Sequence, residues 1–136
     1  MSVFFDTNIL VYAQHQQEDS KADRARALLA DGGKLSVQVL NEFASVSQRK
    51  QRKTWREIEE AIEDVLAVVD PPLALTHELH AAARVLAEEH IMSFYDALIV
   101  ASAIEAGCDT LYTEDLQHGR RFGGLAVVNP FQESAP

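Results

Sequence analysis

Four acidic residues occupy positions that suit chemistry at a binding site. Asp6 directly follows the apolar run 3–5, and Asp115 lies two residues beyond a second such run. Glu42 and Asp96 share helical faces with apolar residues. A carboxylate on an inward face is costly unless it is paired, hydrogen-bonded or bound to a metal ion. Since hard oxygen ligands prefer Mg²⁺ or Mn²⁺ to zinc, converging carboxylates predict a site for one of these ions.

Three of these acids also have simpler explanations. Asp6 could cap a helix and Asp115 a turn. Asp96 is the fourth residue of Ser93-Phe-Tyr-Asp, which is a capping-box pattern. Glu42 has no comparable explanation. The pattern therefore indicates an acidic metal site without separating its members from helix caps.

Strands and helices are expected to alternate along the chain. This order predicts an α/β domain whose central, mainly parallel sheet of about four to five short strands is flanked by helices. Parallel strands present ligands at their carboxyl ends, where Asp6 and Asp115 lie. Strands are expected at residues 3–5, 34–37, 67–69, 110–113 and 125–128, and helices after a cap at Thr7 or Asn8, at 21–30, 38–49, from Thr54 with Glu57 as its capping-box partner, at 77–89, and from Ser93 to Gly107.

Length and composition place the chain among ordinary globular domains. With 136 residues, 47% of them hydrophobic, it fits a single domain at 1–131 followed by a flexible tail at 132–136. Cys108 is the only cysteine, and neither a signal peptide nor a membrane span is expected. These features favour a cytoplasmic protein.

The net charge of −9 excludes binding of nucleic acid by bulk attraction. Two local groups of cations are nevertheless candidates for holding a phosphate backbone. An equally good explanation is a solvated helix end whose cations complement the helix dipole. The candidates are Arg49, Lys50, Arg52 and Lys53 in the first group and Arg120 and Arg121 in the second.

Other reactive side chains carry weaker signals. Cys108 ends an apolar helix and is expected to be structural. His77 and His80 are three residues apart, which without further ligands is weak evidence for zinc. His118 is expected in an exposed loop.

Four segments resemble PIN-domain ribonucleases, and specifically the VapC-type toxins of bacterial toxin–antitoxin pairs. They occur in the order typical of that family and span almost the whole chain. The closing stretch, from Gly124-Leu125 to Asn129-Pro130-Phe131, is similar as well. The four segments are Phe5-Asp6-Thr7-Asn8, Asn41-Glu42-Phe43, Tyr95-Asp96-Ala97-Leu98-Ile99-Val100-Ala101 and Leu111-Tyr112-Thr113-Glu114-Asp115-Leu116.

The resemblance implies a PIN-like fold and a Mg²⁺- or Mn²⁺-dependent endoribonuclease that hydrolyses RNA phosphodiester bonds. It also implies a small cognate antitoxin that inhibits the enzyme, and a homodimer. By resemblance Asp6, Glu42, Asp96 and Asp115 are the catalytic acids that hold one or two metal ions, supported by Thr7, Asn8 and Thr113. Glu114 is left outside the metal ligands.

Two other functions remain open from the sequence. One is a PIN-like nuclease that processes RNA without an antitoxin, and the other is a catalytically inactive protein-interaction module. The complete set of four acids argues against the inactive module.

Overall fold

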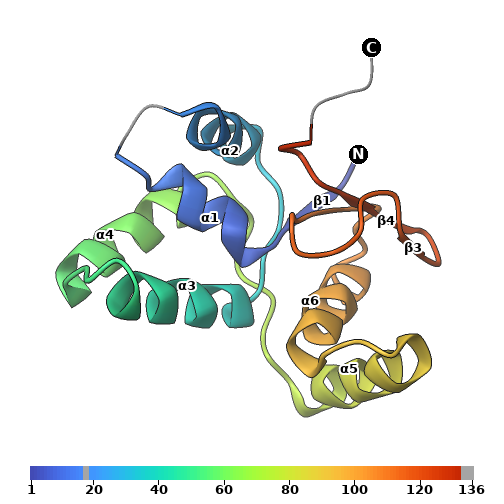
Figure 1. The fold of residues 1–136 in the computed structure, drawn as a ribbon. Helices are drawn as coiled ribbons and strands as arrows, with labels where there is room; N and C mark the ends of the chain where they lie inside the picture. Colours follow the sequence, from blue (N-terminus) through green and yellow to red (C-terminus); the bar gives the residue numbers. More distant parts are fainter. Residues whose placement is uncertain (17–18, 133–136) are drawn as a thin grey trace.

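The structure, a computed structural model, describes residues 1–16 and 19–132. The described residues form six helices and four strands (Figure 1). In chain order they are β1 (Val3–Phe5), α1 (Thr7–Ala13), α2 (Ser20–Ala30), α3 (Val37–Arg49), α4 (Trp55–Leu66), α5 (His77–His90), α6 (Phe94–Glu105), β2 (Thr110–Tyr112), β3 (Arg121–Phe122) and β4 (Leu125–Val128).

The four strands form one sheet in the order β1-β2-β4-β3. β1 pairs with β2 in parallel, and so does β2 with β4, whereas β3 is antiparallel to β4. Phe5 lies opposite Tyr112, so β1 and β2 end at the same edge. The residues that follow these two strands are therefore brought together, which confirms the predicted α/β class with a mainly parallel sheet.

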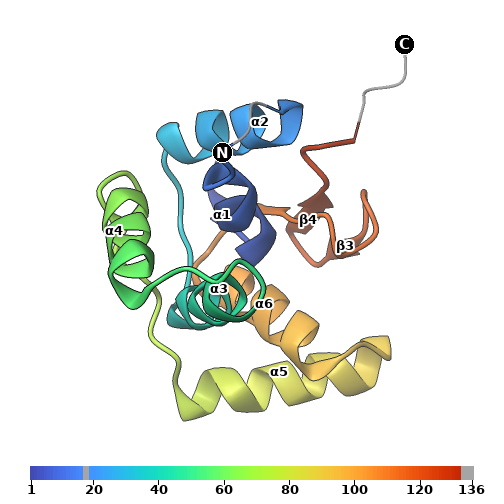
Figure 2. The same ribbon diagram turned by 60° about the vertical axis from the view of Figure 1, so that its left-hand side comes forward.

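The helices form two groups beside this sheet. α1 lies between α2 and α3 and packs against both (Figure 1, Figure 2). α5 packs on α6 and closes a second apolar cluster around Leu79, Ala83 and Leu98. The larger core contains fully buried side chains from β1 and β2, among them Phe4 and Leu111.

Two predicted strands are wrong. Residues 34–37 form only isolated bridges, because Ser36 is the N-cap of α3 and its side chain accepts a hydrogen bond from the Val39 amide. At residues 67–69 the chain forms a helix-end turn, since the Val68 and Val69 amides both donate to the carbonyl of Val65. In both places, residues with high strand propensity lie at the end of a helix instead of in a strand.

The other boundaries differ by small amounts. Asp6 caps α1, where Thr7 or Asn8 was expected, and its side chain accepts from the Thr7 amide. The two-residue strand β3 was not predicted; it turns back onto β4 at Gly123, whose positive φ of 59° suits a glycine. The capping box of Thr54 and Glu57 is confirmed.

The single-domain boundary at 131 stays a prediction, and residues 133–136 of the predicted tail lie outside the described residues. Within the described part of the chain, no helix has both the length and the apolar character that crossing a bilayer requires.

Candidate active site

Asp6 is placed by the first strand and the first helix together. It follows β1 directly and is only 5% exposed. Its Oδ1 accepts a hydrogen bond from the Thr7 amide at 2.7 Å, and its Oδ2 accepts one from the Thr113 hydroxyl at 2.7 Å. Each oxygen keeps a further lone pair, so capping the helix leaves the carboxylate able to bind a cation.

The pKa of Asp6 is raised to about 7. Burial is the largest cause, because desolvation disfavours the charged form. The hydrogen bonds from Thr113 and Thr7 lower the pKa, and the negative charges of Asp115 and Glu42 raise it again. No positive charge among the described residues therefore stabilises the charged form of this buried carboxyl group.

Thr113 links the ends of β1 and β2. Besides donating to Asp6, its hydroxyl oxygen accepts from the Asn8 side-chain amide at 3.2 Å and from the Asp115 backbone amide at 3.0 Å. Asn8 also donates to Asp115 Oδ2 at 3.1 Å. Thr113 and Asn8 thus hold Asp6 and Asp115 in a fixed relation.

Glu42 is half-buried on α3 and faces α1. Its Oε2 accepts a hydrogen bond from the Thr7 hydroxyl at 2.7 Å, and its Oε1 accepts one from Gln38 at 3.2 Å. Thr7, which follows Asp6, therefore fixes a second acid across the gap between two helices. These hydrogen bonds explain how an acid is accommodated beside the apolar residues of α3.

Asp96 lies in the first turn of α6. Its amide donates to the Ser93 Oγ at 3.3 Å, which makes Ser93 the N-cap. Among the described residues, its carboxylate has no hydrogen bond back to the Ser93 amide, so the capping box is only half formed. The Asp96 carboxylate remains available and raises the pKa of Asp115.

Asp115 is exposed at the rim of the cluster. Its pKa is raised, first by partial desolvation and then by the charges of Glu114 and Asp96, although the hydrogen bond from Asn8 opposes this. The four predicted acids are close enough for their charges to interact: Glu42 and Asp115 act on Asp6, and Asp96 acts on Asp115.

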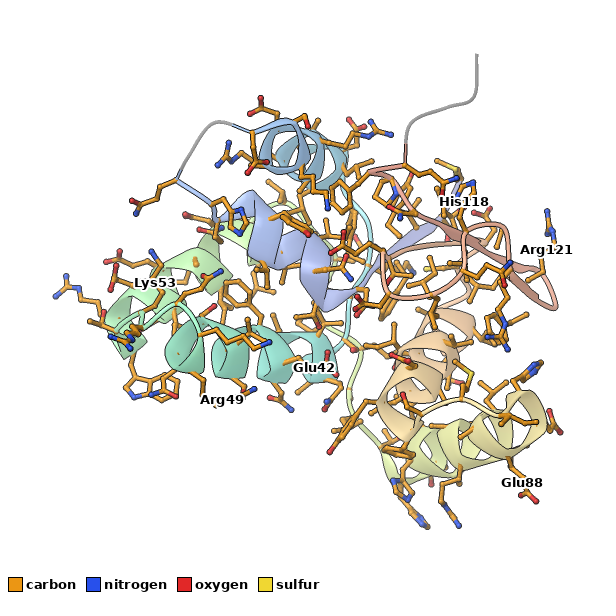
Figure 3. The ribbon with its side chains drawn as sticks, in the orientation of Figure 1. Glu42, Arg49, Lys53, Glu88, His118 and Arg121 are labelled. Carbon is orange, nitrogen blue, oxygen red and sulfur yellow. The ribbon has the colours of Figure 1, made fainter. Side chains whose placement is uncertain are left out.

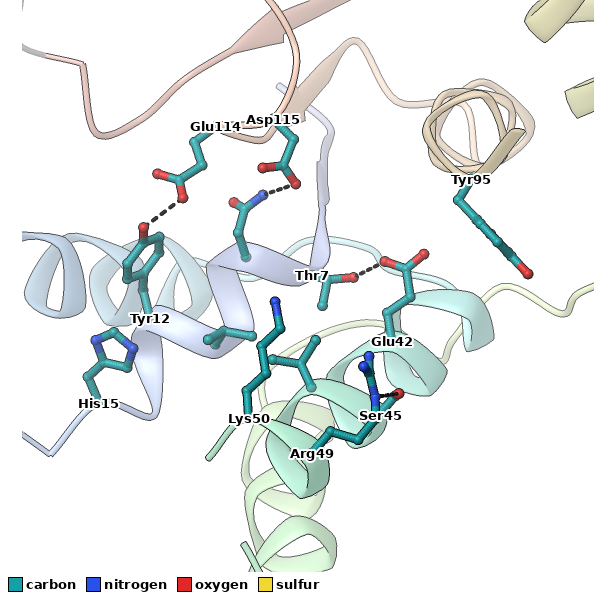
Figure 4. Close-up of a pocket in the computed structure, with 13 residues that line it drawn as sticks. Thr7, Tyr12, His15, Glu42, Ser45, Arg49, Lys50, Tyr95, Glu114 and Asp115 are labelled. Atoms are coloured by element: carbon teal, nitrogen blue, oxygen red, sulfur yellow. Dashed lines mark hydrogen bonds between the residues drawn. The ribbon is translucent and has the colours of Figure 1, made fainter. Parts of the chain in front are cut away.

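Glu114 points away from this cluster into a separate set of contacts (Figure 4). Its carboxylate accepts from the Tyr12 hydroxyl at 2.6 Å and pairs with Lys21 Nζ at 3.1 Å. Lys21 also lies over the Tyr12 ring, 4.8 Å from its centroid. Glu114 thus joins α1 and α2 to the loop after β2, consistent with its place outside the metal ligands.

A groove of about 620 Å³ opens beside the acids (Figure 4). It runs between α1 and α3 and reaches the start of α6. Its walls carry both acids and cations, together with apolar and aromatic side chains. The lining residues that matter here are Thr7, Asn8, Tyr12, His15, Glu42, Arg49, Lys50, Tyr95 and Asp115.

The candidate cations divide into two sets. Arg49 and Lys50 line the groove, whereas Arg52 and Lys53 lie just beyond the end of α3 and do not. Arg121 is on the opposite side of the molecule from Lys53 (Figure 3). Neither Arg121 nor its neighbour is among the residues that line the groove.

The neighbour, Arg120, packs over the ring of Phe122 at 4.8 Å and bonds the His90 carbonyl at 3.5 Å. These contacts give Arg120 a structural role at the antiparallel edge of the sheet. Its role in holding a phosphate backbone stays a prediction, and Arg120 is not among the residues that line the groove.

The other reactive side chains, those of Cys108 and of three histidines, are not among those that line the groove. Cys108 is buried, and burial raises the pKa of its thiol, which disfavours the reactive thiolate. His118 is exposed and accepts from the Asn129 amide at 3.0 Å, outside the groove. His77 and His80 stack with their centroids 6.4 Å apart.

Two further residues of the site, Gln38 and Tyr12, can be recognised by their spacing in the sequence. Gln38 and Tyr12 each lie four residues from a candidate, Glu42 and Asn8 respectively, and this helical spacing places each pair on one face. The exposure of Tyr95 in the groove, by contrast, has no local signal.

The four acids offer the oxygen donors that a hard metal ion prefers. All four are carboxylates, and within the described residues none of them forms an ion pair with Lys or Arg. Asn8 Oδ1 is buried without a hydrogen-bond partner. As they stand, no three His, Cys, Asp or Glu side chains in the described residues form a ready metal cage. The chemistry and charge of the cluster fit a hard divalent cation.

The family of the chain follows from these features and from direct comparison. The model of the PIN domain matches residues 3–121, so the chain belongs to the PIN-domain family. Among curated proteins, none matches the chain in sequence.

Solved structures share the fold at low sequence identity. VapC20 of Mycobacterium tuberculosis, described as a sarcin-ricin-loop-cleaving toxin, is 24% identical with a TM-score of 0.68, covering 84% of this chain and 90% of its own. A toxin–antitoxin complex from Klebsiella pneumoniae is 19% identical with a TM-score of 0.70, covering 97% and 100%. VapBC2 from Rickettsia felis, bound to a promoter DNA fragment, is 22% identical with a TM-score of 0.65, covering 93% and 97%.

Proposed function

We propose that the chain is a Mg²⁺- or Mn²⁺-dependent endoribonuclease that acts as the toxin of a toxin–antitoxin pair. The observation that carries the proposal is the set of four carboxylates, two of which follow β1 and β2 while the other two lie on α3 and α6, and none of which forms an ion pair with Lys or Arg among the described residues. Such a cluster is costly unless it binds positive charge. The proposal is supported by the position of Asp6 and Asp115 just beyond the carboxyl ends of two parallel strands, where open parallel sheets bind ligands.

Asp6, Glu42, Asp96 and Asp115 would hold the metal. When bound, a divalent cation activates water and stabilises the charge that develops on a phosphodiester. The protein's own part is to position these groups. Thr113 and Asn8 hold Asp6 against Asp115, and Thr7 holds Glu42. A carboxylate of this cluster is the group available to accept the proton of the water.

The substrate and partners of the chain are proposed from its structural neighbours. VapC20 is described as cleaving the sarcin-ricin loop, which is RNA. Two other neighbours are complexes of a toxin with its antitoxin. By analogy we propose an RNA substrate, a small cognate antitoxin that blocks the groove, a cytoplasmic location and a homodimer.

The test is cleavage of RNA by purified protein in Mg²⁺ or Mn²⁺. We expect cleavage that stops in EDTA and falls at least a hundredfold in Asp6→Asn, because this substitution removes the buried negative charge from the cluster. Glu60→Gln, on the exposed outer face of α4, is the matched control and should cleave normally. Cleavage that persists in EDTA would reject the metal mechanism.

The antitoxin is tested separately. Co-expression with the small protein encoded beside the gene should yield a complex that no longer cleaves RNA and that recovers activity when the partner is removed. If the purified chain cleaves RNA but forms no such complex, the nuclease stands and the toxin assignment fails.

A further inference from the structure

Asp115 lies in a loop that belongs to no helix or strand. β2 ends at Tyr112, and the next strand begins at Arg121. Among the described residues, the Asp115 backbone amide bonds only the Thr113 hydroxyl, at 3.0 Å, and its carboxylate bonds only the Asn8 side-chain amide, at 3.1 Å. An acid at the rim of the site therefore depends on the rest of its loop for its position.

Glu114, the residue before Asp115, is anchored at both carboxylate oxygens to two different helices. Its Oε1 accepts a hydrogen bond from the Tyr12 hydroxyl of α1 at 2.6 Å, which Figure 4 marks with a dashed line. Its Oε2 accepts one from Lys21 Nζ of α2 at 3.1 Å. Lys21 Nζ also donates to the Tyr12 hydroxyl oxygen at 3.2 Å, which closes a triangle of side chains. Because one rigid peptide unit joins Glu114 to Asp115, an anchored Glu114 limits where Asp115 can move.

Two aromatic rings pack against the Lys21 cation. Its Nζ lies 4.8 Å from the centroid of the Tyr12 ring and 5.6 Å from that of the Phe131 ring, which follows β4. The two rings contact each other edge-to-face at 4.9 Å. A cation is attracted to the negative face of an aromatic ring. Lys21 therefore links α1, α2 and the chain after β4 to the loop that carries Asp115.

The Lys21–Glu114 pair is partly exposed, which limits what it can contribute to overall stability. The two side chains are 46% and 25% exposed, and ion pairs near the surface contribute little to the free energy of unfolding. Lys21 is also not among the residues that line the groove. Its contacts with Glu114 therefore bear on the local geometry of the loop more than on stability or on the groove itself.

We propose that Glu114 and Lys21 are positioning residues that hold Asp115 in place to bind the metal ion. The inference rests on the proposed function, in which Asp115 is a metal ligand, and it adds two residues outside the four acids. Both act through the backbone of the loop, without contacting the metal. Replacing the partners that orient a metal ligand typically changes metal affinity or activity by about 10- to 100-fold.

The opposite charges of the pair separate positioning from two other roles. Lys21→Met removes a positive charge near the acids, and Glu114→Leu removes a negative one. If the pair acted only through its electric field, the two substitutions would change Mg²⁺ affinity in opposite directions. If Glu114 were itself a ligand, only Glu114→Leu would weaken Mg²⁺ binding. Positioning requires that both substitutions weaken it.

The test combines Mg²⁺ titration calorimetry with hydrogen exchange of the Asp115 amide, followed by NMR in EDTA. We expect Lys21→Met and Glu114→Leu each to weaken Mg²⁺ binding about tenfold. In the metal-free protein, both should speed exchange of the Asp115 amide about tenfold, because its bond to the Thr113 hydroxyl opens more often. Lys21→Arg keeps the charge and its donors and should preserve most of both properties.

Two controls show whether the effect passes through Asp115. Arg56→Met removes an exposed cation that pairs with Glu60 at 3.4 Å on α4, outside the groove, and should change neither measurement. In the Asp115→Asn background, Lys21→Met should weaken Mg²⁺ binding no further, since residues that act through one another have non-additive effects.

The inference is overturned if Lys21→Met binds Mg²⁺ as tightly as its parent, if its Asp115 amide exchanges at the parent rate, or if the wild-type chain binds no Mg²⁺. Its failure is distinguishable from that of the proposed function. RNA cleavage by the wild-type chain together with unchanged Mg²⁺ binding in Lys21→Met rejects the positioning role alone. Mg²⁺ binding that depends on Lys21, without any RNA cleavage, rejects the nuclease and retains the positioning role.

Discussion

Thr113 makes three hydrogen bonds from one fully buried hydroxyl group. It donates to Asp6 and accepts from Asn8 and from the Asp115 amide. Each partner belongs to the candidate site, so a residue that has no charge of its own sets the relative position of two acids. The geometry of the candidate site therefore depends on neutral residues between the carboxylates as well as on the carboxylates.

Thr113→Val keeps the side-chain volume and removes all three hydrogen bonds. Leaving buried polar partners unsatisfied should lower the free energy of unfolding by about 1–3 kcal/mol. RNA cleavage should fall as well, because Asp6 and Asp115 lose their common link. The control is Thr110→Val, whose hydroxyl bonds only the neighbouring Asp109 among the described residues. Equal activity in the two variants would contradict the role of Thr113.

The raised pKa of Asp6 predicts the pH dependence of stability in the metal-free protein. Its pKa is 3.8 in the unfolded chain and about 7 in the folded one. Between these values the folded state holds a proton that the unfolded state has released. This contribution to stability is therefore complete below about pH 4 and is lost as pH rises through 7.

The shift of about three pH units corresponds to roughly 4 kcal/mol. Urea unfolding in EDTA should show the free energy of unfolding falling between about pH 4 and pH 7, and Asp6→Asn should flatten most of that fall. A stability that rises with pH across this range in EDTA would show that Asp6 is not buried as a neutral acid.

Among the helices, the N-caps of α4 and α6 have the same hydrogen-bond pattern but different roles. Thr54 begins α4, which lies outside the groove, and Ser93 begins α6, whose first turn carries Asp96. Both side chains accept a hydrogen bond from the amide three residues later. The cap of α6 therefore orients an acid of the site, whereas the cap of α4 stabilises only its helix.

Thr54→Ala and Ser93→Ala should each lower the free energy of unfolding by about 1 kcal/mol, as the loss of an N-cap usually does. Only Ser93→Ala should also lower the rate of RNA cleavage, since Asp96 then loses its fixed position. Thermal melts and cleavage assays on the same preparations check both effects. Comparable loss of cleavage in Thr54→Ala would mean that activity simply follows stability.

The whole molecule carries a net charge of −9, which opposes the approach of RNA. Two features reduce that barrier locally. The acid cluster is suited to be neutralised by divalent cations, and Arg49 and Lys50 add positive charge to the same groove. If a divalent cation binds the cluster as proposed, the groove would attract phosphate.

Mg²⁺ should therefore stabilise the folded protein. Binding of a ligand to the folded state alone contributes about 2.7 kcal/mol when its concentration is a hundred times its Kd, so the Tm should rise by several degrees. NaCl at equal ionic strength should not reproduce the rise. Glu42→Gln should reduce it, and Glu60→Gln on α4 should keep it. An equal effect of Mg²⁺ on both variants would indicate general screening of surface charge.

Local sequence patterns were sufficient to predict most of the helices and strands. The apolar run of β1, the capping box at Thr54 and the cap at Ser93 depend on residues within a few positions of one another, and all three are confirmed. The strands expected at 34–37 and 67–69 are absent because helix ends, whose extent depends on packing, include or adjoin these residues.

The fold class could be predicted from the sequence, and so could the positions of Asp6 and Asp115 after parallel strands. The contacts of these acids could not be predicted, because they depend on how distant segments pack. The hydrogen bond between Thr113 and Asp6 joins residues 107 positions apart, and it exists because β1 and β2 pair in register. The same packing turned Glu114 towards Lys21, left Arg120 at the far edge of the sheet, and exposed Tyr95 in the groove. Local patterns act over a few residues, whereas a binding site is made by contacts across the whole chain.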